Sequence, residues 1–210
     1  MNYPFISDVG IKNGQMGGVL FFYQYAKYSG KTYYADYADE LLDCISKNLN
    51  ENIPVNFGTG LCGIGWGIEY LLQNNFIEGN SDEILEDIDL KIMERDIRMI
   101  GDVSFDTGLE GILCYVLTRM EAHNRQGCGM PFNDLYINEF CKVVHSIPGF
   151  NSKFIQRIED VNTGRINYGQ KLVLTDVVDT SSSYLSKNLA DYSLGLHGGL
   201  TGMALNRMMQ

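Results

Sequence analysis

The sequence predicts an all-α protein in which nearly apolar helices alternate with amphipathic ones. Three observations support this fold class. The pattern Gly-x-x-Gly followed by an apolar run occurs four times, with its first glycines at Gly14, Gly60, Gly108 and Gly199. These glycines are 46, 48 and 91 residues apart, so the last interval is close to twice the others. An amphipathic segment follows each of the first three runs. A fixed period of this length is typical of a helical repeat protein.

The apolar runs are predicted to form buried inner helices. They read "GVLFFYQYAKYSG", "IGWGIEYLLQNNF", "ILCYVLTRMEA" and "MALNRMMQ". A helix that is apolar nearly all round is buried. Asn13, Thr59 and Thr107 stand directly before the first three motifs, and these residue types favour the N-cap position. We therefore expect them to cap their helices, with the glycines in the first turn where a neighbouring backbone comes close.

The amphipathic segments are predicted to form an outer layer of helices. They are "KTYYADYADELLDCISKNL", "NSDEILEDIDLKIMERDIRMI" and "MPFNDLYINEFCKVVHSI". In each of them the apolar residues recur at helical spacing and leave one polar face. Asn80 and Glu83 in the second segment form a capping-box pattern.

The repeats indicate a single domain over residues 1–210. The four units are expected near residues 10–55, 56–103, 104–147 and 148–210. Residues 148–192 fit the pattern least. There we expect a short helix in "NSKFIQRIEDV", a loop that turns at Gly164 and Gly169, an irregular crossing at "LVLTDVV" and a last outer helix in "SSYLSKNLADYSLGL".

Composition restricts the partners and the compartment. The formal net charge is −10 and no stripe of Lys and Arg is present, which argues against nucleic acid and anionic membranes as partners. No apolar run reaches the roughly 18 residues of a membrane span, and the N-terminus lacks the features of a signal peptide. A cytoplasmic location is expected. The five cysteines contain no C-x-x-C pair, which disfavours a disulfide framework or a compact zinc knuckle.

The stretch G-T-G-L-C-G at residues 58–63 has two interpretations. It matches the dinucleotide-binding pattern G-x-G-x-x-G, which requires a strand directly before it. The preceding "ENIPVNF" is a poor strand, and Gly-x-x-Gly recurs as a helix start. Close packing of helix ends is therefore the favoured interpretation, and no cofactor is expected.

Several helix N-termini that point into one space would make it electropositive. Asp106 and His197 hold equivalent places two residues before a Gly-x-x-Gly, so they could meet there as a carboxylate–imidazole pair. With Glu110 they are the candidate catalytic residues, although a capping role for Asp106 and a structural role for His197 stay open. The candidate pocket residues are Cys62, Trp66, Thr59, Thr107 and Thr201.

This pattern resembles the lanthionine synthetase C-like (LanC-like) family. The phrases "GLCGIGWGIEYLLQNNFIEGNSDEILEDID" and "GLHGGLTGMAL" are similar to bacterial members, and the resemblance runs from about residue 10 to the C-terminus. It implies an α/α toroid, which usually has seven inner and seven outer helices in this family. Because only about four repeats are present, we expect a partial or open toroid.

The peptide-cyclising members bind one zinc ion through two cysteines and a histidine, placed just before the Gly-x-x-Gly motifs. The corresponding positions here hold Lys12 and Asn13, Gly58 and Thr59, Asp106 and Thr107, and His197 and Gly198. None of them is a cysteine, whereas a catalytic zinc site needs about three protein ligands. We therefore expect no metal and no cyclase activity of the usual kind.

Three functions follow from the resemblance. The first is a peptide-binding or scaffolding role in a peptide-modification pathway, with a short acidic or polar peptide in the central pocket. The second is a glycoside hydrolase-like enzyme on the same toroid, with Asp106 and Glu110 as paired carboxylates about 5–10 Å apart. The third is a degenerate relative kept for assembly. A homodimer or a partner chain is expected to cover the open ends.

Overall fold

The computed structural model describes residues 6–50, 52–123, 130–165, 172–176 and 195–208. These residues form eight α-helices, two short 3-10 helices and no strand, which confirms the all-α prediction. The helices are α1 (Gln15–Ser29), α2 (Tyr33–Asn48), α3 (Leu61–Gln73), α4 (Ser81–Met93), η2 (Ile97–Met99), α5 (Leu109–His123), α6 (Asp134–Ser146), α7 (Ser152–Asn162), η3 (Leu174–Asp176) and α8 (Leu200–Met208).

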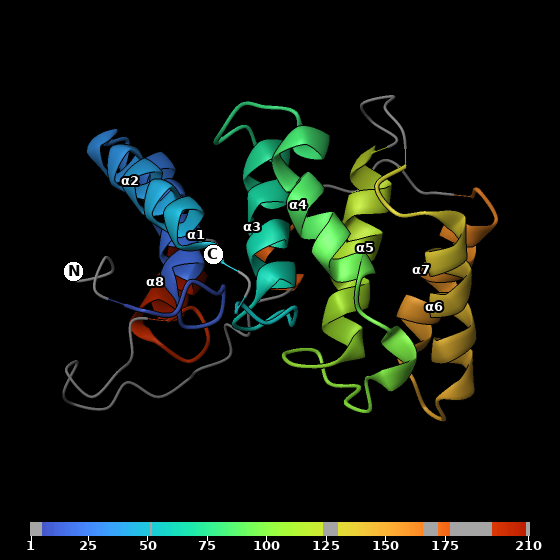
Figure 1. The fold of residues 1–210 in the computed structure, drawn as a ribbon. Coiled ribbons are helices and arrows are strands. Elements are labelled where there is room, and N and C mark those ends of the chain that lie inside the picture. Colours follow the sequence, from blue (N-terminus) through green and yellow to red (C-terminus); the bar gives the residue numbers. More distant parts are fainter. Residues whose placement is uncertain (1–5, 51, 124–129, 166–171, 177–194, 209–210) are drawn as a thin grey trace.

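The glycine-headed helices lie side by side. Helix α8 packs on α1, α1 on α3, and α3 on α5. Helix α2 covers α1, α4 contacts both α3 and α5, and α7 packs between α5 and α6. Figure 1 shows α1, α2 and α8 at one end of the molecule and α6 and α7 at the other. Within the described residues these two ends stay apart, so the helices do not close into a ring.

Burial separates the inner helices from the outer ones. Helix α5 buries 13 of its 15 residues, whereas α2 buries three of its 16. The side chains of α3 and α5 meet in one hydrophobic core, in which Trp66 and Tyr115 are among the largest fully buried residues. The predicted pairing of a buried helix with an amphipathic cover is confirmed for α1 and α2. No helix in the described part of the chain has both the length and the apolar character that a membrane span requires.

The capping prediction for Asn13 and Thr59 is wrong. The N-cap residues are Gly14 and Gly60, and neither helix start has a side-chain cap. Backbone carbonyls of the preceding loop take that role, because the loop turns back onto the helix start. The carbonyls that accept from the first helical N–H groups are those of Asp8 for Gln15 (2.9 Å), Pro54 for Leu61 (2.8 Å) and Asp102 for Leu109 (2.9 Å).

Thr107 does not cap α5 either. Its hydroxyl donates a hydrogen bond to the Asp102 carboxylate at 2.5 Å, and the Ser104 N–H donates to the same side chain at 2.8 Å. These bonds lower the pKa of Asp102. Thr107 therefore stabilises the loop before α5, and the loop in turn caps the helix through its backbone.

The second glycine of each motif lies against the same returning loop. A Cβ on Gly63 would overlap with the carbonyl oxygen of Phe57, six residues upstream. The same relation joins Gly17 to Ile11, Gly111 to Phe105, and Gly202 to Leu196. No strand is found among the described residues before α3. The packing interpretation of these glycines is therefore supported over a dinucleotide cradle.

The remaining local predictions have mixed outcomes. Asn80 is the N-cap of α4, as predicted, and accepts a hydrogen bond from the Asp82 N–H (3.0 Å); its contact with Glu83 is made by its side-chain amide (3.2 Å) and not by the backbone N–H that a capping box uses. The short helix in "NSKFIQRIEDV" is α7, and Gly164 has a φ of +71°, as a turn residue should. Gly169 and most of the last outer helix in "SSYLSKNLADYSLGL" lie outside the described residues.

Candidate functional site

The loops before the four glycine-headed helices meet through backbone hydrogen bonds. The His197 N–H donates to the Lys12 carbonyl (3.2 Å), the Lys12 N–H to the Gly58 carbonyl (3.0 Å), and the Gly58 N–H to the Asp106 carbonyl (2.8 Å). Each of these residues stands two positions before the first glycine of its motif. We call this meeting point the loop junction. It fixes α8, α1, α3 and α5 in that spatial order.

A small cavity of about 10 Å³ lies at the loop junction. Its lining consists of Ile11, Lys12, Phe57, Gly58, Asp106, Leu196 and His197. The structure thus brings Asp106 and His197 to the same place, as their equivalent positions in the repeat suggested. The cavity has room for roughly one water molecule. A peptide does not fit into it, so the expected central peptide pocket is not present at this point.

Asp106 has a different partner from the one expected. Its carboxylate forms an ion pair with the Lys12 ammonium, and the two side chains are 45% and 24% exposed. His197 is exposed on the same cavity. The carboxylate–imidazole pair is thus replaced by a carboxylate–ammonium pair that links the loop before α5 to the loop before α1.

The starts of α1 and α3 at the loop junction are not open to an anion. The first two N–H groups of α3, those of Leu61 and Cys62, donate to the Pro54 and Val55 carbonyls at 2.8 and 3.2 Å. The first two of α1 are bonded to its own loop in the same way. Because a helix N-terminus binds anions through its free N–H groups, these bonds reduce the expected electropositive character.

The other predicted site residues do not line this cavity. Trp66 is 1% exposed and stacks on Tyr70, with ring centroids 5.5 Å apart. Cys62 and Thr201 are also buried, whereas Thr59 and Thr107 are exposed. Glu110 is half-buried in the first turn of α5. The cavity lining contains none of these six residues.

The Cys62 thiol is expected to be unreactive. Burial raises its pKa well above the ordinary value, and the nearby Cys114 and Asp89 raise it further. Because the thiolate is the reactive form, iodoacetamide at pH 8 should leave Cys62 unmodified in the native protein and modify it after unfolding in urea. Peptide mapping by mass spectrometry measures this. Stoichiometric labelling of native Cys62 would show that the site is open.

The described residues do not make the zinc site that the family resemblance implies. Among them, no group of three or more His, Cys, Asp and Glu side chains could hold a metal ion. At the loop junction, the ammonium group of Lys12 has no lone pair that could bind a metal ion, and Gly58 has no side chain. Asp106 and His197 are then the remaining donors at the four equivalent positions, fewer than the three protein ligands of a catalytic zinc site.

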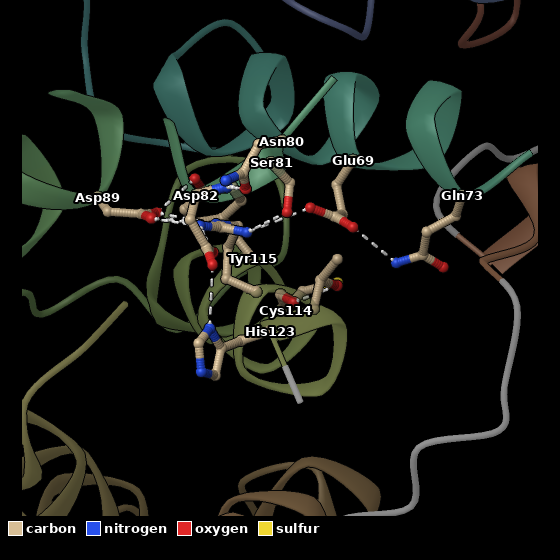
Figure 2. A network of polar contacts seen from close by, with 11 residues as sticks. Glu69, Gln73, Asn80, Ser81, Asp82, Asp89, Cys114, Tyr115 and His123 are labelled. Atoms are coloured by element: carbon tan, nitrogen blue, oxygen red, sulfur yellow. Dashed lines mark hydrogen bonds and ion pairs between the residues drawn. The ribbon is translucent and has the colours of Figure 1, made fainter. Parts of the chain in front are cut away.

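Sequence reasoning missed a buried polar cluster between α3, α4 and α5. We call it the Arg119 cluster, and its members are Glu69, Ser81, Asp82, Asp89, Tyr115, Arg119 and His123. The Arg119 guanidinium donates to Asp89 (2.9 Å), Asp82 (2.9 Å), Ser81 (3.1 Å) and Glu69 (3.3 Å). Figure 2 shows carboxylates from α3 and α4 converging on one point from different sides.

The Arg119 cluster holds more carboxylates than cations. Burial raises the pKa of Asp89, while its bonds from Arg119 and Tyr115 act in the opposite direction. The Tyr115 hydroxyl donates to Asp89 at 2.6 Å, and burial raises the pKa of that hydroxyl well above its usual value. His123 Nδ1 lies 3.2 Å from the Asp82 carboxylate, at the outer end of the cluster (Figure 2). The cluster is nearly closed to solvent, which favours a structural role.

One sequence signal could have revealed this cluster. Glu69 and Arg119 are charged residues inside runs that were predicted to be buried all round. Charged residues are almost never fully buried unless they are paired. The sequence could therefore have predicted that the second and third inner helices are joined by an ion pair.

A larger hollow lies between α1, α2 and α8. Its volume is about 670 Å³, and it is lined by Phe21, Phe22, Tyr25, Tyr33, Tyr34, Tyr37 and Ala204. We call it the aromatic groove. Six of these seven residues are aromatic and come from α1 and α2, while Ala204 comes from α8. The volume is typical of a ligand pocket, so this groove is a place where the described residues could take up a ligand.

The comparisons with known proteins agree with this architecture. No curated protein and no solved structure gives a significant match to the chain. The family model described as lanthionine synthetase C-like protein matches residues 6–170, which is well over half of the sequence. That range contains the first three glycine-headed helices and their covers. The chain therefore belongs to the lanthionine synthetase C-like family.

Proposed function

We propose that this chain has a peptide-binding or scaffolding role in a peptide-modification pathway and does not itself supply a zinc centre. The observation that carries the proposal is the aromatic groove. It combines ligand-pocket volume with a wall of aromatic rings, and peptides commonly bind in grooves that aromatic side chains line.

The loop junction supports the proposal that this chain does not supply a zinc centre. The positions where cyclising members have zinc ligands come together at one cavity, yet two of them hold an ammonium and a glycine. The alternative, a glycoside hydrolase, needs two facing carboxylates. In the described residues Asp106 is the one carboxylate that lines this cavity, and its partner is Lys12. No observation favours that alternative.

A peptide panel tests the proposal. The probes are fluorescein-labelled heptapeptides of glycine and serine that carry two arginines, two citrullines, two glutamates or two phenylalanines. We expect saturable binding of at least one of them in a fluorescence anisotropy titration. The proposal of a peptide-binding role is wrong if none saturates below about 1 mM, the weak end of specific binding.

The absence of a zinc centre is measured separately. The purified protein is incubated with equimolar zinc sulfate, dialysed, and analysed for metal by mass spectrometry. We expect zinc well below one ion per chain, because the described residues do not assemble three ligands. One zinc ion per chain remaining after dialysis would overturn this part of the proposal. The homodimer or partner chain at the open ends stays a prediction.

A further inference from the structure

We infer that the aromatic groove binds cationic side chains, so that its ligand is a peptide segment carrying arginine or lysine. This inference rests on the proposed peptide-binding function and names the chemistry of the peptide. Two independent observations lead to it, namely the arrangement of the rings and the charges beside them.

The rings of the aromatic groove form one packed cluster in which some pairs are nearly parallel, as Phe21 and Tyr25 are at 8°, and others meet at steep angles. Tyr25 and Tyr34 are 4.6 Å apart at 72°, and Phe22 and Tyr37 are 4.8 Å apart at 86°. Tyr33 and Tyr34 lie 4.2 Å apart at a tilt of 39°. These rings pack on one another in the wall of the groove, where six of the seven lining side chains are aromatic. Because an aromatic face is the negative side of the ring quadrupole, a groove with this lining favours a cation over an anion.

The charged residues of α2 also favour a cationic ligand. This helix exposes the carboxylates of Asp36, Asp39, Glu40 and Asp43 against the single ammonium of Lys47. Asp36 follows Tyr33 by three residues and Glu40 follows Tyr37 by three, and residues at this spacing share a helix face. Burial, and then the charge of Glu40, raise the pKa of Tyr37, in keeping with this shared helix face. A cationic segment would therefore meet carboxylates at the edge and ring faces inside.

Two cations stand near the same groove. Lys31 precedes α2 and acts electrostatically on Tyr34, and Arg207 follows Ala204 by three residues on α8. Both side chains are exposed, where salt and water weaken their repulsion of a ligand. The ring faces and the carboxylates both attract a cationic ligand, whereas Lys31 and Arg207 repel it. The balance therefore favours a basic ligand over an acidic one.

The test compares the arginine heptapeptide with its citrulline counterpart. Citrulline keeps the planar shape and hydrogen-bonding groups of arginine without the charge. We expect the arginine peptide to bind about tenfold more tightly than the citrulline peptide, and the glutamate peptide to bind least. Binding of the arginine peptide should weaken as the salt concentration rises.

Matched variants locate the binding site. Tyr33→Leu removes a ring of the groove, and Tyr28→Leu removes a ring of α1 that does not line it; these tyrosines are 53% and 66% exposed, so both variants should fold. We expect Tyr33→Leu to weaken binding of the arginine peptide by about fivefold, and Tyr28→Leu, whose ring stacks on Tyr25 without lining the groove, to weaken it less. Glu40→Gln should weaken binding, whereas Lys31→Gln should not. Circular dichroism checks the fold of each variant.

The outcomes separate this inference from the proposed function. Equal binding of the arginine and citrulline peptides would overturn the preference for cations and leave peptide binding intact. The same holds if Tyr28→Leu and Tyr33→Leu weaken binding equally, since the peptide would then lie elsewhere. If no peptide of the panel saturates, the proposed function fails, and the inference fails with it.

Discussion

Replacing Arg119 with leucine is expected to lower the free energy of unfolding by about 3–5 kcal/mol. The Arg119 side chain is fully buried, and the carboxylates of Glu69 and Asp89 are 2% and 5% exposed. Removing the guanidinium leaves both carboxylates in the interior without their counter-charge. Because α3, α4 and α5 each contribute to this cluster, the loss acts on the packing of three helices at once. Urea denaturation followed by circular dichroism measures it.

Arg157→Leu is the matched control. Arg157 on α7 also forms a two-pronged pair, with both bonds to the Glu121 carboxylate at 3.0 Å, but its side chain is 37% exposed. A partly exposed pair contributes about 1 kcal/mol or less. Equal destabilisation by Arg119→Leu and Arg157→Leu would show that burial of the Arg119 cluster has no special energetic role.

The decrease in the free energy of unfolding caused by Arg119→Leu should depend on pH. Burial already raises the pKa of Asp89, and the bonds from Arg119 oppose that rise. Without them, the folded-state pKa of Asp89 moves further above its unfolded value. The folded variant then binds a proton more tightly than the unfolded chain, so its stability increases as the pH falls. The difference from the wild type should be largest at pH 7 and smaller at about pH 5. A deficit that is constant over this range would contradict the electrostatic explanation.

The sequence was sufficient for the α-helices of the described residues and for one feature of the site. The apolar runs reveal inner helices because burial on all sides leaves a compositional signal, as α5 shows. The repeat also placed Asp106 and His197 at equivalent positions, and the structure brings both to one cavity. Helices α5 and α8 are not neighbours in the spatial order, so it is the meeting of all four loops that brings these equivalent positions together.

What the sequence did not reveal has physical reasons. The helix starts are capped by backbone carbonyls, and a backbone acceptor has no residue signature, so Thr59 looked like the cap. The partner of Asp106 is Lys12, 94 residues away, and nothing local in the chain specifies that pairing. The aromatic groove combines α1 and α2 with Ala204 of α8. Its Ala204 wall depends on α8 packing beside α1, which no pattern within either segment indicates.

Gly63→Ala is expected to destabilise the protein by about 3 kcal/mol. In an ordinary helix interior this change is favourable by about 0.5–1 kcal/mol, because alanine loses less backbone entropy than glycine. Here a Cβ would overlap with the carbonyl oxygen of Phe57 and lie 2.7 Å from Cγ2 of Ile11. Both atoms belong to loops that meet at the loop junction, so neither can move without disturbing it.

The strain should therefore spread beyond α3. Phe57 is joined to Gly58, whose N–H and carbonyl bond to Asp106 and Lys12 across the loop junction. Hydrogen exchange should show faster exchange of the Lys12 and Gly58 amides in Gly63→Ala than in the wild type. Gly101→Ala is the control, since a Cβ there would have no atom within 4 Å. If Gly63→Ala is as stable as Gly101→Ala, the loop carbonyls do not lie against the helix starts, and the glycines at the equivalent positions need another explanation.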